Sequence, residues 1–160
     1  MNDSSLINKA KEIISKILYI TIATSTKDGT PWNSPVYSAY DEDYNFYWAS
    51  DQNGQHSKNI KENDKVFLVI YDSTALEGTG EGVYVQAQAH MLTVEKEILE
   101  ALEVLDKRVG KNKERDAKKF LGEYPRRVYK AVPEKVWMNG DGDINGNYID
   151  IRIEVELLRK

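Results

Sequence analysis

The stretch FYWASDQNGQHSKNIKENDKVFLVIYD, residues 46–72, decides how this chain folds. It opens and closes on runs rich in aromatic and β-branched residues, which predict strands at 46–50 and 66–72. The second run is almost continuously apolar, so we expect a strand that is buried on both faces. The polar residues between the runs include a glycine turn, after which Ser57 and Lys58 mark the start of a short helix. The stretch therefore predicts two strands connected through a helix.

The residues before this stretch predict a helix followed by a hairpin. Residues 4–17 place apolar side chains on one helical face, at Ile7, Ala10, Ile14 and Ile17. The β-branched run 18–25 leads to Asp28-Gly29, a strong hairpin signal, and then to a second strand at 33–41. Because Pro35 in that strand cannot donate a ladder hydrogen bond, we expect it at an edge or a bulge.

After residue 72 the hydrophobic period changes twice. Residues 82–93 alternate apolar and polar side chains, which predicts a half-buried strand. Residues 98–109 change to helical spacing, and 113–122 are expected to continue as a second helix. Strands at 127–138 and 148–157 close the chain. The sequence therefore predicts a single α+β domain over 1–160.

The expected architecture is an antiparallel split β-barrel of about six to seven strands, because closing the sheet hides its edges. An N-terminal helix and a helical pair before the last two strands complete it.

Composition excludes several classes of protein. The chain has 22 basic and 26 acidic side chains and a net charge of −4, with no long basic run, so we expect no nucleic-acid partner. It has no cysteine, which excludes disulfides, thiol nucleophiles and thiolate metal sites and suits a reducing cytoplasm. No run approaches the roughly 18 apolar residues of a membrane span, and no signal peptide is recognised. We therefore expect a soluble cytoplasmic protein without a membrane partner.

Ser57 and Lys58 form a candidate phosphate site. A helix N-terminus presents free N–H groups and positive potential, and a hydroxyl and an ammonium beside it complete a cradle for an anion. The alternative is that Ser57 only caps the helix and Lys58 is solvated.

The strand that contains Asn33 and Ser34 is a second candidate. An edge strand leaves backbone donors and acceptors free, and a planar heterocycle uses such groups along its rim. The alternative is an ordinary edge strand.

Two motifs resemble sites of other kinds. The glycine-rich segment 78–82 precedes a strand and opens no helix, so a mobile hairpin loop is predicted instead of a nucleotide site. Asp141, Asp143, Asn145 and Gly146 match a calcium loop, but Arg152 stands where the last carboxylate is needed. We expect an Asn- and Gly-containing hairpin turn there, with a calcium-stabilised domain as the alternative.

Histidine is too scarce for a multi-histidine metal site. His56 and His90 are the only two histidines, and we expect His90 to be a sheet residue. No metal ligand and no catalytic residue is therefore nominated from the sequence.

Four segments in succession resemble the FMN-binding core of the pyridoxamine 5′-phosphate oxidase-like split-barrel family. They are NSPVYSAYDED, FYWAS, HSKNI and VFLVIYD, and the later VYVQAQAHML and KVWMNG resemble the family's following strand and its C-terminal Trp segment. The resemblance implies an FMN site between two copies of the chain. Its cofactor-binding residues are Asn33, Ser34, Pro35, Val36, Tyr47, Trp48, Ala49, Ser50, Ser57, Lys58 and Trp137.

The resemblance also implies a role for each group. Residues 33–36 line one edge of the flavin, 47–50 run beneath the ring system, Ser57 and Lys58 hold the phosphate, and Trp137 reaches the flavin of the partner subunit. It implies a homodimeric flavoprotein that transfers hydride through FMN to or from a small substrate or acceptor. The alternative is a non-enzymatic protein that binds or senses a flavin, deazaflavin or haem.

The chain departs from the family pattern at its basic positions. Asn33 stands where the oxidases often carry Arg, and Ser38 occupies a later basic position, so the phosphate grip is thinner. Residues 141–152 replace the Arg- and His-rich segment that grips pyridoxamine phosphate, and that molecule is not the expected substrate.

Overall fold

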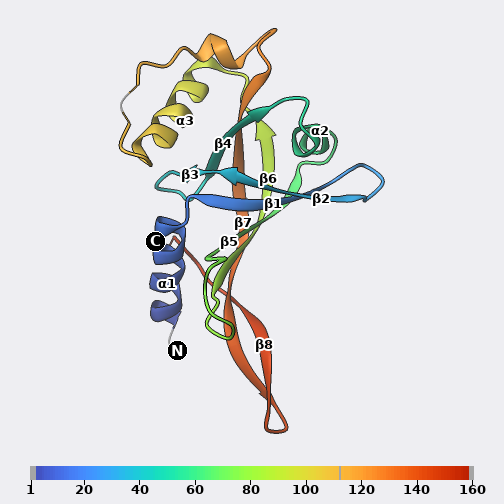
Figure 1. The fold of residues 1–160 in the computed structure, drawn as a ribbon, viewed down its shortest axis with the longest axis vertical. Helices are drawn as coiled ribbons and strands as arrows, with labels where there is room; N and C mark the ends of the chain where they lie inside the picture. Colours follow the sequence, from blue (N-terminus) through green and yellow to red (C-terminus); the bar gives the residue numbers. More distant parts are fainter. Residues whose placement is uncertain (1–2, 112, 159–160) are drawn as a thin grey trace.

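A computed structural model describes residues 3–111 and 113–158 and shows an α+β architecture (Figure 1). Its helical elements are α1 (Asp3–Lys16), α2 (Gln55–Glu62), α3 (Glu95–Lys107) and the 3₁₀ helix η1 (Ala117–Phe120). Its strands are β1 (Tyr19–Ser25), β2 (Pro31–Tyr37), β3 (Ala39–Tyr40), β4 (Phe46–Asp51), β5 (Lys65–Tyr71), β6 (Gly82–Met91), β7 (Arg126–Ile144) and β8 (Asn147–Glu154). The predicted fold class is confirmed.

The sheet curls into a barrel because its two ends are neighbours in the chain. The strand order is β2-β1-β5-β6-β7-β4-β3, with β8 paired to β7 outside this path. Ser38 alone separates β2 from β3, and its N–H donates to the carbonyl of Leu18 over 2.9 Å. The strand predicted at 33–41 is therefore two strands, one pairing with β1 and the other with β4.

Alternating side chains fill the barrel. Trp48, Ile22, Leu68 and Val85 are fully buried in its main cluster, and α1 adds Ala10 and Ile14 to it. A second cluster lies outside the barrel, where α3 packs on the outer face of β4. Its buried members include Tyr47, Leu102 and Val128. Strand β4 thus contributes to both clusters, one through each face.

Two predictions about individual elements are wrong. Residues 65–71 are buried on one face only, because the barrel encloses Val66, Leu68 and Ile70 while Phe67 and Tyr71 lie on its outer surface. Residues 113–122 form no regular helix beyond the single 3₁₀ turn of η1, which Asp116 caps by accepting from the N–H of Lys118.

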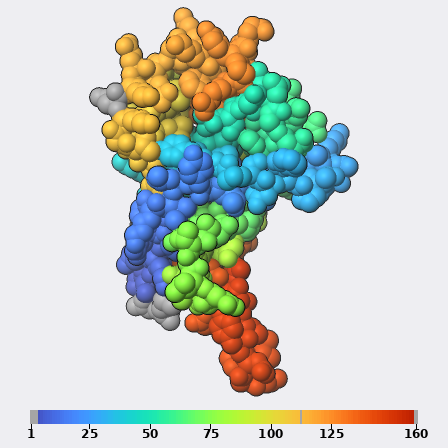
Figure 2. All heavy atoms as spheres, viewed as in Figure 1, coloured from blue at the N-terminus to red at the C-terminus, as the bar shows by residue number. Residues whose placement is uncertain are grey.

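The last two strands form a hairpin arm that projects from the barrel (Figures 1 and 2). Asn145 and Gly146 have φ values of 54° and 80°, which is the geometry of a two-residue hairpin turn. Asp143 accepts a hydrogen bond from the N–H of Gly146, and Arg152 pairs with Asp150. The calcium-like motif is therefore the tip of a hairpin. Within residues 3–111 and 113–158, no group of three or more His, Asp or Glu side chains is arranged to hold a metal ion.

None of the helices in the described part of the chain is long and apolar enough to cross a membrane.

Candidate functional site

The N-terminus of α2 is open to a ligand. Gly54 occupies the N-cap position, and no side chain there accepts a hydrogen bond from the first turn. The first intrahelical bond runs from the N–H of Lys58 to the carbonyl of Gly54, so the preceding N–H groups have no partner within the helix. Ser57 does not cap the helix, in contrast to the alternative considered from the sequence.

Ser57 is buried at this point, with 3% of its surface exposed. Its Oγ forms no hydrogen bond of ordinary geometry with a described residue, although it interacts with the side chain of Tyr129. Asn59 on the same helix, by contrast, donates to Thr24 Oγ1 over 3.0 Å. Lys58 is exposed beside it. A buried hydroxyl without a partner costs free energy, which a ligand that accepts its hydrogen bond would recover.

Ser57 and Lys58 line a cavity of about 490 Å³, here called the α2 cavity. Its other walls come from the end of β6, through Ala89, His90 and Met91, and from Tyr129 at the start of β7. Lys61, one turn along α2, adds a second ammonium group. Asp64 contributes one carboxylate to the same lining. The cavity therefore combines two cations, one carboxylate and the Ser57 hydroxyl with an aromatic ring.

Burial sets the electrostatics of the neighbouring rings. Desolvation raises the pKa of Tyr129, and the Ser57 hydroxyl acts in the opposite direction. The Tyr129 ring is stacked on Trp48 with 5.5 Å between centroids. Burial lowers the pKa of His56, whose Nε2 has no hydrogen-bond partner among the described residues. Both rings are therefore neutral near pH 7.

The structure separates the predicted residues of β2 and β4 by face. Tyr47 and Ala49 lie on the outer face towards α3, while Trp48 lies in the barrel core with none of its surface exposed. On β2, Val36 is buried in the core and Asn33 and Pro35 are exposed.

The other predicted members of these strands, Ser34 and Ser50, are half-buried. Strand β2 ends the sheet order, so no strand of the described residues pairs with its second edge over 31–37. Helix α2 packs against β1, β2 and β6, which brings the edge strand near the α2 cavity.

Trp137 lies apart from these residues. It pairs with Tyr84 on β6 and stacks on Phe67 with 6.2 Å between ring centroids, in the half of β7 that leads to the hairpin arm. One chain therefore does not bring Trp137 to the α2 cavity.

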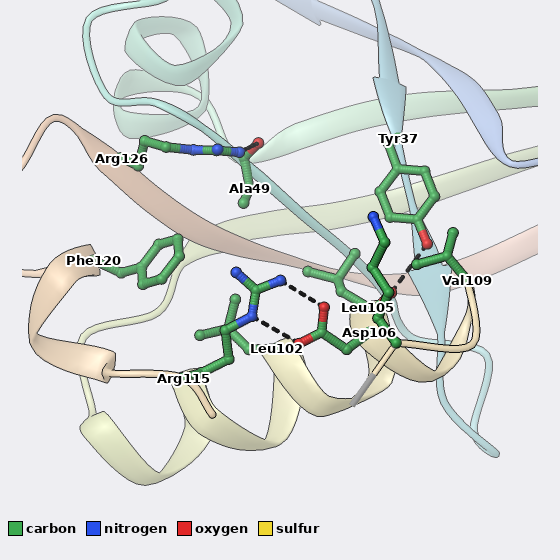
Figure 3. A pocket seen from close by; sticks show the side chains of 10 residues that line it. Tyr37, Ala49, Leu102, Leu105, Asp106, Val109, Arg115, Phe120 and Arg126 are labelled. Atoms are coloured by element: carbon green, nitrogen blue, oxygen red, sulfur yellow. Dashed lines mark hydrogen bonds and ion pairs between the residues drawn. The ribbon is translucent and has the colours of Figure 1, made fainter. Parts of the chain in front are cut away.

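A second cavity, of about 230 Å³, lies between α3, η1 and the outer face of β4 (Figure 3). We call it the α3–β4 cavity. Tyr37 and Ala49 form one wall, and the Tyr37 hydroxyl donates to the carbonyl of Leu105 over 3.0 Å. Burial, with a hydrogen bond to Asp41 as the second cause, raises the pKa of the nearby Tyr47 hydroxyl.

The sequence analysis did not identify Lys61, His90 and Tyr129 of the α2 cavity, or Arg126 of the α3–β4 cavity. Lys61 carried a readable signal, because it lies one helical turn after Ser57 and Lys58 on the predicted helix. His90, Tyr129 and Arg126 come from distant strands, and only the pairing of β4, β6 and β7 places them.

Comparison with known proteins identifies the family. Residues 6–140 match the family described as pyridoxamine 5′-phosphate oxidase. The comparison with proteins of curated function found no match.

Solved structures share the fold at low sequence identity. ChuZ of Campylobacter jejuni has a TM-score of 0.71 and 16% identity, and the alignment covers 94% of this chain and 61% of ChuZ. A proposed 5-nitroimidazole antibiotic resistance protein of Bacteroides thetaiotaomicron has a TM-score of 0.69 and 14% identity, covering 82% of this chain and 81% of that one. HutZ of Vibrio cholerae, a haem storage protein, has a TM-score of 0.67 and 16% identity, covering 85% and 94%. At these identities the likeness shows the fold alone.

Proposed function

This chain belongs to the pyridoxamine 5′-phosphate oxidase family, and from that premise we propose that it is an FMN-binding oxidoreductase whose flavin lies between two copies of the chain. Bound FMN would supply hydride transfer to or from a small substrate or acceptor. The chain's own residues bind the phosphate, orient the ring and exclude water.

The observation that carries the proposal is the buried Ser57 hydroxyl. It forms no hydrogen bond of ordinary geometry with a described residue and interacts only loosely with the Tyr129 hydroxyl. It lies at an uncapped helix N-terminus and opens with Lys58 on a cavity of about 490 Å³. A phosphate accepts hydrogen bonds from such N–H and O–H donors and pairs with the ammonium group. The residues present therefore fit a phosphate monoester.

Ser38 supports the thinner phosphate grip inferred from the sequence. Its side chain is buried and its Oγ donates to the carbonyl of Ala39 over 3.3 Å, so this position supplies no cation and its hydroxyl proton is already used. Lys58 and Lys61 are therefore the cations available to bind the phosphate.

The outer face of the barrel supports the homodimer. Tyr19 on β1 and Phe67 and Tyr71 on β5 are exposed on two neighbouring strands of that face. Contiguous apolar surface of this kind marks a protein interface. Trp137 stacks on Phe67 at this face, so pairing two copies there would carry Trp137 towards the partner's flavin.

An absorption spectrum tests the flavin directly. Purified protein mixed with FMN should retain a flavin spectrum after gel filtration, and NADH or NADPH should bleach it under anaerobic conditions. Retention without bleaching would leave a flavin-binding protein and contradict the oxidoreductase part of the proposal. Loss of all flavin on gel filtration would contradict the whole proposal.

Haem binding is the second candidate function, and His90 favours it. His90 lines the α2 cavity beside Met91, and imidazole is a common ligand of haem iron. HutZ, which shares the fold, is a haem storage protein. Haem titration should then give a Soret shift that His90→Gln abolishes and the matched His56→Gln retains. An unchanged shift in both variants would exclude His90 as the ligand.

A further inference from the structure

The α3–β4 cavity has a charge surplus that its own residues do not neutralise. Three cations line it, Lys111, Arg115 and Arg126, and Asp106 is the single carboxylate on its wall. Asp106 is buried and accepts two hydrogen bonds from Arg115, 2.7 Å from Nε and 2.5 Å from Nη2. This pair is neutral as a unit, so two positive charges remain.

Neither Lys111 nor Arg126 forms an ion pair with any described residue. Glu103 pairs with Lys107 over 2.7 Å. Asp51 lies opposite Arg126 in the strand register, and its carboxylate accepts from the N–H of Asn53. Lys111 is near enough to Asp106 to help lower the pKa of that carboxyl, after the larger effect of Arg115. The three cations and one carboxylate that line the cavity give it a net charge of +2.

Arg126 is arranged to donate to a ligand. Figure 3 shows its guanidinium over Ala49, across the cavity from Arg115. It donates one hydrogen bond, to the carbonyl of Ala49 over 3.2 Å. A guanidinium has five N–H donors, and the others of Arg126 have no partner among the described residues.

The remaining wall of the cavity is apolar. Leu102, Leu105 and Phe120 are buried side chains whose surfaces face this space, and Val109 closes it. A volume of about 230 Å³ is many times the roughly 10–15 Å³ that a single water molecule needs, which leaves room for one small aromatic acid. A simple inorganic anion would leave this apolar wall in contact with water.

We infer that the α3–β4 cavity binds a small organic anion, with its charged group against Arg126 and Lys111 and its apolar body against Leu102 and Phe120. Ala49, on the opposite wall, belongs to the predicted flavin site. The identification of this anion as the substrate rests on the proposed function, whereas its binding does not require a flavin.

The test uses benzoate and its neutral counterpart benzamide as probes of the full-length chain, without FMN and in a buffer free of carboxylates and phosphate. A ¹H–¹⁵N NMR titration should give a benzoate affinity at least about tenfold higher than that for benzamide, with shifts at 102–111, 115 and 126. Arg126→Gln and Lys111→Gln should each weaken benzoate binding by about tenfold and leave benzamide unchanged. Both side chains are exposed, so folding should survive.

The matched control is Arg152→Gln, an exposed arginine on the hairpin arm. It should leave benzoate binding unchanged. The inference would be overturned if the chain bound no benzoate, or bound benzoate and benzamide with equal affinity. It would also be overturned if the NMR shifts lay outside the cavity residues, or if Arg126→Gln and Arg152→Gln weakened benzoate binding equally. A chain that binds benzoate but no FMN would retain the anion site and refute the proposed function, so the two failures are distinguishable.

Discussion

Burial changes the protonation of single side chains, and His56, next to the α2 cavity residue Ser57 in the chain, shows how. It lies in the first turn of α2, half-buried, with its Nε2 unpartnered among the described residues. Burial lowers its pKa below the ordinary value of 6.5, because the charged imidazolium loses solvation.

This shift makes stability pH-dependent in a defined direction. The unfolded chain binds a proton at His56 below about pH 6.5, while the folded chain resists it, so the stabilisation present above pH 6.5 is lost as the pH falls. We predict that the melting temperature falls less between pH 7.5 and 5.5 in His56→Gln than in the wild type. His90→Gln, which changes the exposed histidine, is the control and should follow the wild type. Identical slopes in all three proteins would contradict the assignment.

The ion pair of Asp106 and Arg115 gives a second prediction at this scale. Arg115 holds the pKa of the buried Asp106 carboxyl below its ordinary value through two hydrogen bonds. Arg115→Gln should leave this carboxylate underpaired and lower the free energy of unfolding by roughly 1–3 kcal/mol, measured by urea denaturation. Arg152→Gln breaks the exposed pair with Asp150 and should lower the free energy of unfolding much less than Arg115→Gln does. Equal losses would mean that burial of Asp106 has no energetic consequence.

At the scale of elements, β6 and β5 show what the sequence can and cannot reveal. The alternation of Val83, Val85 and Ala87 in the sequence correctly indicates a strand with one buried face. The predicted strand at 82–93 matches β6 closely. The apolar run at 66–72 predicted two buried faces, because Phe67 and Tyr71 look like core residues in sequence. They lie on the outer surface of the barrel, where Phe67 stacks on Trp137 and Tyr71 is exposed.

Only part of the α2 cavity could be predicted, because sequence patterns show local spacing and not which distant residues meet. Ser57 and Lys58 are contiguous on one helix, so local spacing found them. The faces of β4 required the barrel, which turns Trp48 inward and Ala49 outward. Three of the charges of the α3–β4 cavity, Asp106, Lys111 and Arg115, lie close together in sequence, but only the packing of η1 and β4 against α3 shows that they share a cavity with Arg126.

A substitution in the turn of the hairpin arm should increase amide hydrogen exchange along the whole arm. Gly146 has a φ of 80°, and an L-residue there costs about 1–2 kcal/mol. We predict that Gly146→Ala speeds amide hydrogen exchange across 140–151 by about tenfold while the melting temperature of the barrel changes little. Gly80→Ala is the control, because Gly80 has no positive φ and no atom within 4 Å of an added Cβ. Unchanged exchange in Gly146→Ala would contradict the turn geometry.

At the scale of the whole molecule, the apolar outer face predicts association. Sedimentation should report twice the chain mass of 18.3 kDa. Phe67→Glu places a charge on that face beside Trp137 and should shift the protein to monomer and release FMN. Leu99→Glu, at an exposed apolar position of α3, should remain dimeric. A monomeric wild type that retains FMN would contradict an interfacial flavin.

The phosphate anchor is the centre of the proposed function, and paired titrations of FMN and riboflavin test it most directly. The two flavins differ only in the phosphate, so their affinities isolate the contribution of Ser57 and Lys58. We predict that Lys58→Ala weakens FMN binding by about tenfold or more, from the roughly 1.5–3 kcal/mol of a charged hydrogen bond, and leaves riboflavin binding unchanged. Lys65→Ala, an exposed lysine on β5, is the matched control and should bind both flavins like the wild type. Equal loss of FMN and riboflavin in Lys58→Ala, or equal wild-type affinity for the two flavins, would contradict a phosphate site at the N-terminus of α2.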